Sequence, residues 1–327
     1  MGQGRAAMID RSELLRGMPA VCRAVGAAVF RVGIPAACLL ALAGCSTYLE
    51  VQGASVERRD PDSLSAMLKP AYRSFRPSGP GPFPTAILAS GCDGPKDNLD
   101  RWATMLVERG WAALIVDSHG PRGYDAAQRW RLVCAGQILT GGERAGDIAV
   151  AIEDARKLEF VDPDRILLMG ASHGGWAILD MLALHARGRT PYNLSRWPDS
   201  LSAPTLEGFA GAILLYPYCG VASQVRRAGW RGDLPALFLL VEGDTIVDEE
   251  ACHVLAESMA ARGAEVDVHL LRGTTHGFDQ VEKSAFSRLE FSPDALSEAQ
   301  AVVTDFLARQ SKAPDHPGRA RGDGRKP

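Results

Sequence analysis

The chain has 327 residues, of which 46% are hydrophobic and 23% are charged, so it can build a sizeable core and is not a disordered chain. Its formal net charge of −3 provides no basic excess for binding a nucleic-acid backbone. The absence of an internal apolar stretch of 18 or more residues argues against a protein with several membrane spans.

The first 44 residues have the features of an export signal. Five arginines precede an uncharged apolar run of 12 residues, 32–43, which suits a signal peptide and is short for a membrane span. Residues 42–45 (Leu-Ala-Gly-Cys) resemble the lipobox of bacterial lipoproteins. This resemblance implies a lipid on Cys45 and, with Ser46 next, a periplasmic protein anchored to the outer membrane. The alternative is an ordinary secretory signal that is cut after residue 43.

Removal of residues 1–44 and lipidation of Cys45 leave four cysteines, namely Cys92, Cys134, Cys219 and Cys252. An even number of cysteines in an oxidising compartment predicts two disulfides, for which three connectivities are possible. A metal site is not expected, because the chain has no Cys-x-x-Cys or His-x₃-His spacing.

Residues 45–83 form an N-terminal linker whose weak periodicity and five prolines predict short edge strands and turns. Short apolar strands then alternate with helices. The predicted strands are residues 85–89, 111–116, 165–169, 212–216, 236–241 and 266–271. The predicted helices are residues 99–109, 144–158, 173–186, 249–261 and 293–308. This alternation predicts an α/β catalytic domain over residues 84–310, with a mostly parallel sheet covered by helices on both faces.

Two segments fall outside this alternation. Residues 188–208 are an insertion rich in Arg, Pro and Ser, for which a lid over the site and a plain surface loop are alternatives. Residues 311–327 contain three prolines, three glycines and five Lys or Arg, which predicts a disordered tail.

A Gly-x-Ser-x-Gly motif occupies residues 170–174 and places Ser172 between a predicted strand and a predicted helix. Glycines permit the sharp turn of such an elbow, where neighbouring backbone leaves no room for a Cβ. The elbow presents the hydroxyl at the carboxyl edge of the sheet, near the positive end of a helix. The pattern predicts that Ser172 is a nucleophile.

A serine nucleophile needs a general base, and the base needs a carboxylate to orient it. In this architecture the chain order is Ser, then acid, then His. His276 follows the last predicted strand in a loop, and we predict that it is the base. The other downstream histidines lie in predicted helices, in a strand, in the tail or directly beside Ser172. Asp244 follows strand 236–241 and is the predicted acid, with Glu242 as the second candidate.

The negatively charged oxygen of an acyl-transfer intermediate needs preorganised N–H donors. The backbone N–H of His173, at a helix start, is one predicted donor. The second is expected in the loop formed by residues 90–94, where Cys92 is preferred and Asp93 is the alternative. A plain glycine turn is the structural alternative for this loop.

These segments together resemble the dienelactone hydrolase family of the α/β-hydrolase superfamily, in its exported branch. The segments that carry the resemblance are residues 91–94, 117–123, 170–175, 216–217, 244–247 and 276–278. The resemblance implies an eight-strand-type sheet and hydrolysis of esters or lactones without a cofactor. The founding enzymes have a cysteine nucleophile where this chain has Ser172, and Ser90 and Val241 replace a histidine and a glycine of the family.

The resemblance also implies residues that bind substrate. Family members often hold a substrate carboxylate with an arginine in the loop after the second central strand, where this chain has Arg122. An ion pair with Asp117 or Asp125 is an equal alternative for Arg122. His119, in the same loop, is predicted to line the pocket.

Two disulfide pairings involve the predicted site. A bond between Cys92 and Cys134 would brace the loop that holds the second N–H donor, and Cys219 would pair with Cys252. The sequence does not decide between these and the other connectivities.

The sequence therefore predicts an exported, lipid-anchored serine hydrolase that acts on a small-molecule ester or lactone through Ser172, His276 and Asp244. No cofactor, metal or nucleic acid is expected, and no oligomeric state is indicated. A peptidase or acyltransferase on the same residues is one alternative. A catalytically silent binding lipoprotein is the other, and the replacements at Ser90 and Val241 favour it.

Overall fold

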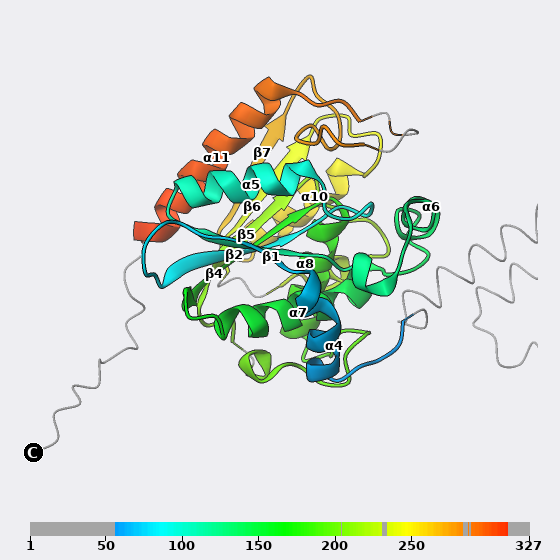
Figure 1. The fold of residues 1–327 in the computed structure, drawn as a ribbon. Coiled ribbons are helices and arrows are strands. Elements are labelled where there is room, and N and C mark those ends of the chain that lie inside the picture. Colours follow the sequence, from blue (N-terminus) through cyan, green and yellow to red (C-terminus); the bar gives the residue numbers. More distant parts are fainter. Residues whose placement is uncertain (1–55, 204, 231–233, 284–286, 288, 313–327) are drawn as a thin grey trace, which may run out of the picture.

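The computed structural model describes residues 56–203, 205–230, 234–283, 287 and 289–312 (Figure 1). The predicted export signal, Cys45 and the tail from residue 313 lie outside the described residues. At the centre of the fold is a seven-stranded sheet with the order β1-β3-β2-β4-β5-β6-β7. Its strands run parallel except β1, which pairs antiparallel with β3 at one edge.

Every strand and helix with a predicted range is present, with ends that differ by a few residues, and the described part of the chain adds one edge strand without a predicted range and three α-helices that were not predicted. The strands are β1 (Arg73–Phe75), β2 (Phe83–Ala89), β3 (Ala112–Val116), β4 (Val161–Ala171), β5 (Phe209–Leu215), β6 (Ala236–Val241) and β7 (Val266–Leu271). The α-helices are α4 (Pro61–Leu68), α5 (Asp97–Glu108), α6 (Ala126–Gln128), α7 (Gly141–Arg156), α8 (His173–Ala186), α9 (Val225–Ala228), α10 (Glu249–Ala260) and α11 (Pro293–Lys312). The α/β-hydrolase fold is confirmed, with seven strands in the described part of the chain where an eight-strand-type sheet was implied.

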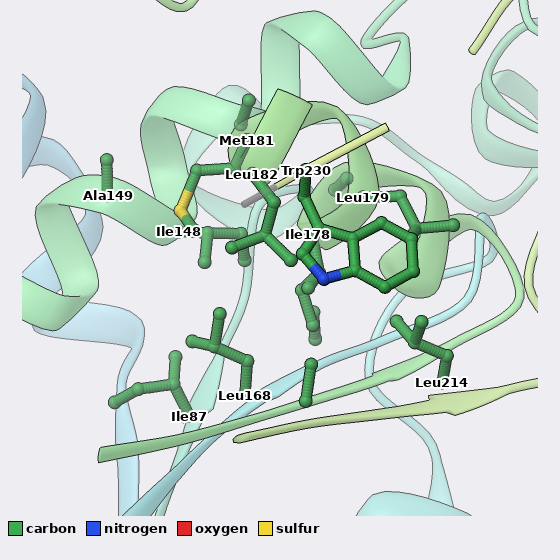
Figure 2. Close-up of a cluster of buried hydrophobic side chains, with 14 of the residues drawn as sticks. Ile87, Ile148, Ala149, Leu168, Ile178, Leu179, Met181, Leu182, Leu214 and Trp230 are labelled. Atoms are coloured by element: carbon green, nitrogen blue, oxygen red, sulfur yellow. The ribbon is translucent and has the colours of Figure 1, made fainter. Parts of the chain in front are cut away.

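Helices cover both faces of the sheet. Helices α4, α7, α8 and α10 pack on one face, where Figure 2 shows Leu168 of β4 facing Ile148 of α7 and Leu182 of α8. Helices α5 and α11 cover the other face and bury Trp102 and Phe306 there. The central strands are apolar along their whole length because helices exclude water from both faces of the sheet. Each large apolar side chain that is fully buried there stabilises the fold by about 1.5–3 kcal/mol.

The segment before β2 differs from the prediction of edge strands and turns. From residue 56 onward it contains one short edge strand, β1, and a helix, α4, that was not predicted because its prolines were interpreted as turn residues. Asp60 caps this helix by accepting hydrogen bonds from the N–H groups of Asp62 and Ser63, and Pro61 is its first residue. Proline fits the first turn of a helix because its missing N–H would have no partner there. Pro61 therefore marks a helix start and not a turn.

The insertion at residues 188–208 packs against α7. The N–H of Tyr192 donates to the carbonyl of Gly142 at 3.0 Å, and the Asn193 amide donates to the Asp147 carboxylate at 2.9 Å. None of its described residues lines the cavity that holds Ser172. These contacts agree with the surface-loop alternative for the described part of the insertion, which packs on α7. Among the described helices, none combines the length and the apolar character that a bilayer span requires.

Candidate active site

Ser172 occupies a strained turn between β4 and α8. Its backbone has φ 51° and ψ −112°, a conformation that side-chain-bearing residues rarely adopt. A Cβ on Gly174 would lie 2.2 Å from the carbonyl oxygen of Ala89, at the end of β2. The motif glycines therefore let the turn pack directly against the neighbouring strand, and this packing holds Ser172 at the carboxyl edge of the sheet.

The structure brings Ser172, His276 and Asp244 into one hydrogen-bonded chain. His276 Nε2 lies 2.9 Å from Ser172 Oγ, and His276 Nδ1 lies 2.6 Å from Asp244 Oδ2. The side chains of His276 and Asp244 are only 6% and 1% exposed. A proton on Nδ1 that is donated to the carboxylate leaves Nε2 free to accept the hydroxyl proton, which is the arrangement that activates a serine.

The carboxylate of Asp244 is itself held in place. Its Oδ1 accepts the N–H groups of Ile246 at 2.8 Å and Val247 at 3.2 Å, which leaves Oδ2 for the imidazole. Glu242, the second candidate for the acid, instead pairs with Arg272 at the surface, at 3.2 Å. The three residues, in the chain order Ser, acid, His, follow strands β4, β6 and β7, and their side chains meet at the carboxyl edge of the sheet.

A buried carboxylate that the sequence did not single out anchors the His276 loop. Asp279 accepts a hydrogen bond from the Tyr216 hydroxyl at 2.6 Å and another from the Trp102 indole N–H at 2.7 Å. The Tyr216 ring also packs edge-on against the His276 ring, with centroids 4.7 Å apart. Burial raises the pKa of Asp279. These contacts tie the loop to β5 and α5, and no local sequence pattern marks them.

The two predicted N–H donors, Cys92 and His173, both line the cavity beside Ser172. His173 is the first residue of α8, where a backbone N–H has no partner within the helix and is available to an anion. Among the described residues, Ser172, Cys92 and His173 therefore provide a hydroxyl and two candidate N–H donors on one wall.

Arg144, which the sequence analysis identified only as the first residue of a predicted helix, contacts both segments that carry the candidate N–H donors. Its Nη1 donates to the Ser90 carbonyl at 2.9 Å and to His173 Nδ1 at 3.0 Å. Burial lowers the pKa of Arg144 to about 10, so it stays charged at neutral pH. Burial and this charge hold the pKa of His173 well below its usual value, which keeps its imidazole neutral and able to accept.

The cavity in front of Ser172 has a volume of about 550 Å³ and is lined mainly by apolar and aromatic side chains. One wall is Trp130 with residues 134–136, a segment between β3 and α7 in which the sequence analysis gave a role to Cys134 alone. Tyr218, Ile246 and Leu289 belong to the other walls. The cavity suits a small organic molecule.

Arg122 is not a cavity residue, which corrects its expected role in holding a substrate carboxylate. Its guanidinium makes two hydrogen bonds of 2.8 Å to the carboxylate of Asp147, and a third to the Ser118 carbonyl. The ion-pair alternative describes Arg122, but the partner is Asp147 on α7 and not Asp117 or Asp125. The partner follows from the path of α7 under the loop, which the sequence does not reveal.

His119 is also absent from the cavity wall, which corrects the prediction that it lines the pocket. Its side chain is fully buried next to Asp117, with His119 Nδ1 3.8 Å from Asp117 Oδ1. Burial lowers the pKa of His119 to about 4, so its imidazole is neutral at physiological pH.

Both predicted disulfides are present. Cys92–Cys134 links the loop that carries the candidate N–H donor to the cavity segment 134–136, and Cys219–Cys252 links the segment after β5 to α10. The bonds close loops with sequence separations of 42 and 33 residues, so each stabilises the fold by a similar amount.

A pair of double variants separates stability from positioning at Ser172. Replacing both Cys92 and Cys134 by alanine, or both Cys219 and Cys252, is expected to lower the free energy of unfolding by about 3 kcal/mol in either case. Only the first pair is expected to slow the reaction of Ser172 with a fluorophosphonate. Urea unfolding and labelling rates measure the two effects. Equal labelling rates in the two double variants would contradict this role of Cys92–Cys134.

Asp180 makes the stability of the fold depend on pH. This buried carboxyl group on α8 accepts hydrogen bonds of 2.6 Å from the Ser223 hydroxyl and the Gln224 N–H. Burial raises the pKa of Asp180 to about 7 from 3.8, so the folded protein holds this proton more tightly than the unfolded chain. The stabilising contribution is therefore complete below about pH 4 and is lost as the pH rises through about 7.

We expect Asp180→Asn to remove this pH dependence. Between pH 4 and 7 the free energy of unfolding of the wild type should fall, relative to the variant, by up to about 1.4 kcal/mol for each pH unit. Urea unfolding at several pH values measures the difference. Parallel stability profiles of the two proteins would show that Asp180 does not titrate in this range.

Comparison with known proteins agrees with this architecture. The model of the prolyl oligopeptidase family matches residues 98–189, and that of the dienelactone hydrolase family matches residues 200–311. Dipeptidyl-peptidase 5 of Porphyromonas gingivalis is 28% identical over 109 residues, which cover 32% of this chain but only 15% of that relative's length. The match therefore concerns one segment of a much longer protein.

Two solved structures share the fold. The dienelactone hydrolase-like promiscuous phosphotriesterase P91, from metagenomic libraries, superimposes with a TM-score of 0.53 and 16% identity, covering 73% of this chain and 98% of that one. Esterase 2 of Thermogutta terrifontis, bound to butyrate, gives a TM-score of 0.51 and 17% identity, covering 75% of this chain and 91% of that one. These two structures show the fold, and the match of residues 200–311 to the family model confirms the resemblance to the dienelactone hydrolase family that the sequence motifs indicate.

Proposed function

We propose that this hydrolase, with its α/β-hydrolase fold and its resemblance to the dienelactone hydrolases, cleaves carboxylic esters or lactones through an acyl-enzyme on Ser172. The observation that carries the proposal is the hydrogen-bonded chain from Ser172 through His276 to Asp244. An isolated serine hydroxyl is a weak nucleophile, and this chain supplies the base and the carboxylate that activate it.

The first half of the reaction forms the acyl-enzyme. Ser172 Oγ attacks the carbonyl carbon of the substrate while His276 Nε2 takes the hydroxyl proton. The carbonyl π electrons move onto the oxygen, and the N–H groups of Cys92 and His173 stabilise the resulting oxyanion. When the oxyanion collapses, the bond to the alcohol oxygen breaks and His276 gives its proton to that oxygen. Asp244 stabilises the imidazolium in between.

The second half releases the acid. A water molecule gives a proton to His276 Nε2 and attacks the acyl carbon. The tetrahedral intermediate then collapses, the bond to Ser172 Oγ breaks, and His276 returns the proton to this oxygen. The reaction consumes one water and leaves the protein unchanged. A lactone follows the same course, except that alcohol and acid stay joined as one hydroxy acid.

A peptidase is the second candidate, supported by the match of residues 98–189 to the prolyl oligopeptidase family. The same three residues serve amide hydrolysis, so the fold does not separate the two reactions. The cavity of about 550 Å³ is of the size that small ligands fill, which favours a small ester or lactone.

We also propose that the protein acts outside the cytoplasm, anchored to the outer membrane through a lipid on Cys45. The sequence of residues 42–45 and the two disulfides support this, because disulfides persist in oxidising compartments. Radiolabelled palmitate should enter the full chain and not a Cys45→Ala variant. Equal labelling of both proteins would contradict the anchor.

The function is tested by treating the full chain with a fluorophosphonate, mapping the adduct by mass spectrometry, and assaying p-nitrophenyl butyrate, a lactone panel and peptide anilides. An adduct on Ser172 with turnover of esters or lactones is the expected result. An adduct on Ser172 with turnover of the anilides alone would favour the peptidase. A folded protein that forms no adduct would favour the silent binding lipoprotein.

A further inference from the structure

The cavity in front of Ser172 has an unusual charge distribution. Asp93 is the single acidic residue among its described lining residues, and no lysine or arginine is among them. The arginine expected to hold a substrate carboxylate, Arg122, is paired with Asp147 elsewhere. A substrate with a carboxylate would therefore meet a negative charge and no positive one.

The carboxylate of Asp93 is half-buried and has few partners. Its Oδ2 accepts a hydrogen bond from the Gln280 amide at 3.3 Å, and the main-chain N–H of Asp93 also stabilises the carboxylate. Within the described part of the chain, no cationic side chain forms an ion pair with it. Lys96 and Arg129 are the cations whose fields reach it, but Arg129 Nη1 is used by the main-chain carbonyl of Asp93, at 3.1 Å. Burial accordingly raises the pKa of Asp93, because the charged form is poorly solvated.

Aromatic rings share the cavity with this carboxylate. Trp130, Trp176 and Tyr218 all line it, and the rings of Trp176 and Tyr218 pack with centroids 4.8 Å apart. The face of an aromatic ring attracts cations, and indole attracts them most strongly. A carboxylate and aromatic rings in one mostly apolar cavity form an environment that suits an organic cation better than an inorganic one, since the apolar atoms of the ligand also lose contact with water.

We propose that the substrate of this chain carries an ammonium group and that Asp93 holds this group in the cavity while the ester carbonyl lies at Ser172. This inference rests on the proposed function for its reaction, but the binding of the cation does not depend on hydrolysis. Asp93 is then a specificity residue, and neutral and cationic esters are preferred over the carboxylate-bearing lactones that the family resemblance would imply.

The first test measures binding alone. Phenyltrimethylammonium is titrated calorimetrically into the purified full chain and into Asp93→Asn and Asp305→Asn variants. Asp305 is an exposed carboxylate on α11 outside the cavity lining, so Asp305→Asn controls for the lost charge. The expected result is an affinity about 10-fold lower in Asp93→Asn, and unchanged in Asp305→Asn. Equal affinities in all three proteins, or no binding to the wild type, would overturn the proposal.

The second test measures turnover with pairs of substrates of equal shape. Butyrylcholine and 3,3-dimethylbutyl butyrate differ only in the charge of the alcohol part. The ethyl esters of trimethylammonioacetate and 3,3-dimethylbutanoate differ only in the charge of the acyl part. For every ester, kcat/KM is divided by the rate constant of its hydrolysis by hydroxide, which corrects for differences in intrinsic reactivity. We expect kcat/KM to favour the cation by about 10-fold in at least one pair, and this preference to disappear in Asp93→Asn.

The outcomes separate the two proposals. Equal turnover of the cationic and neutral esters in both pairs would overturn the role of Asp93 and leave the proposed hydrolysis intact. A cation preference that survives in Asp93→Asn would likewise overturn this role. If no ester is hydrolysed, the proposed function fails, and the titration with phenyltrimethylammonium still decides whether the cavity binds an organic cation.

Discussion

Replacement of Ser172 by alanine is expected to lower kcat for ester hydrolysis by about 10⁵-fold or more, with little change in the affinity for a ligand that binds without reacting. The change removes the oxygen that lies 2.9 Å from His276 Nε2 and leaves the cavity and the candidate N–H donors in place. Steady-state assays with active-site titration measure kcat, and calorimetry measures ligand binding.

A matched control is Ser195→Ala. Ser195 is exposed on the insertion at residues 188–208 and does not line the cavity, so this variant should keep the rate of the wild type. Activity of Ser172→Ala within 10-fold of the wild type would show that another group attacks the substrate. The proposed mechanism would then be wrong.

Replacement of Asp244 by asparagine is expected to lower kcat by about 10⁴-fold without unfolding the protein. The asparagine oxygen can still accept the N–H groups of Ile246 and Val247, so the loop keeps its shape. Its NH₂ group then points at His276 Nδ1, which must accept a proton and not donate one. This moves the imidazole proton to Nε2, where it blocks the transfer from Ser172.

Glu242→Gln tests whether the loss depends on position. Glu242 lies two residues from Asp244 and pairs with Arg272 at the surface, so its replacement should leave kcat within about 2-fold of the wild type. The assay is kcat with one ester, together with the melting temperature of each variant. Similar losses of kcat in the two variants would point to a general effect of charge and away from orientation of His276.

Local patterns were sufficient for strands β2 to β7, for the five long helices that follow β2, and for the chain order of the site. Apolar runs of strand length, alternating with amphipathic helices, predicted the parallel sheet, and a Gly-x-Ser-x-Gly elbow between a strand and a helix predicted the position of Ser172. His276 and Asp244 could be chosen because parallel strands bring their carboxyl ends to one edge of the sheet. Each of these arguments uses residues that are close in sequence, or an architecture that is shared by many chains.

The remaining features depend on contacts between distant elements. Arg122 binds Asp147 because α7 crosses beneath its loop, and Arg144 reaches the Ser90 carbonyl from the same helix. Trp130 joins the cavity wall because a segment that Cys134 ties to Cys92 folds back over Ser172. Such partners are set by how helices pack on the sheet, and no spacing along the chain reveals them.

Because the backbone of Ser172 is strained, a substitution at this position that raises thermal stability can abolish activity. Holding a residue with a side chain at φ 51° costs about 1–3 kcal/mol, which glycine would relieve. A library screened for thermal tolerance alone would thus be enriched in glycine at position 172, and so in proteins that have lost the hydroxyl. A screen for more thermostable variants of this protein must therefore measure turnover from the first round of selection.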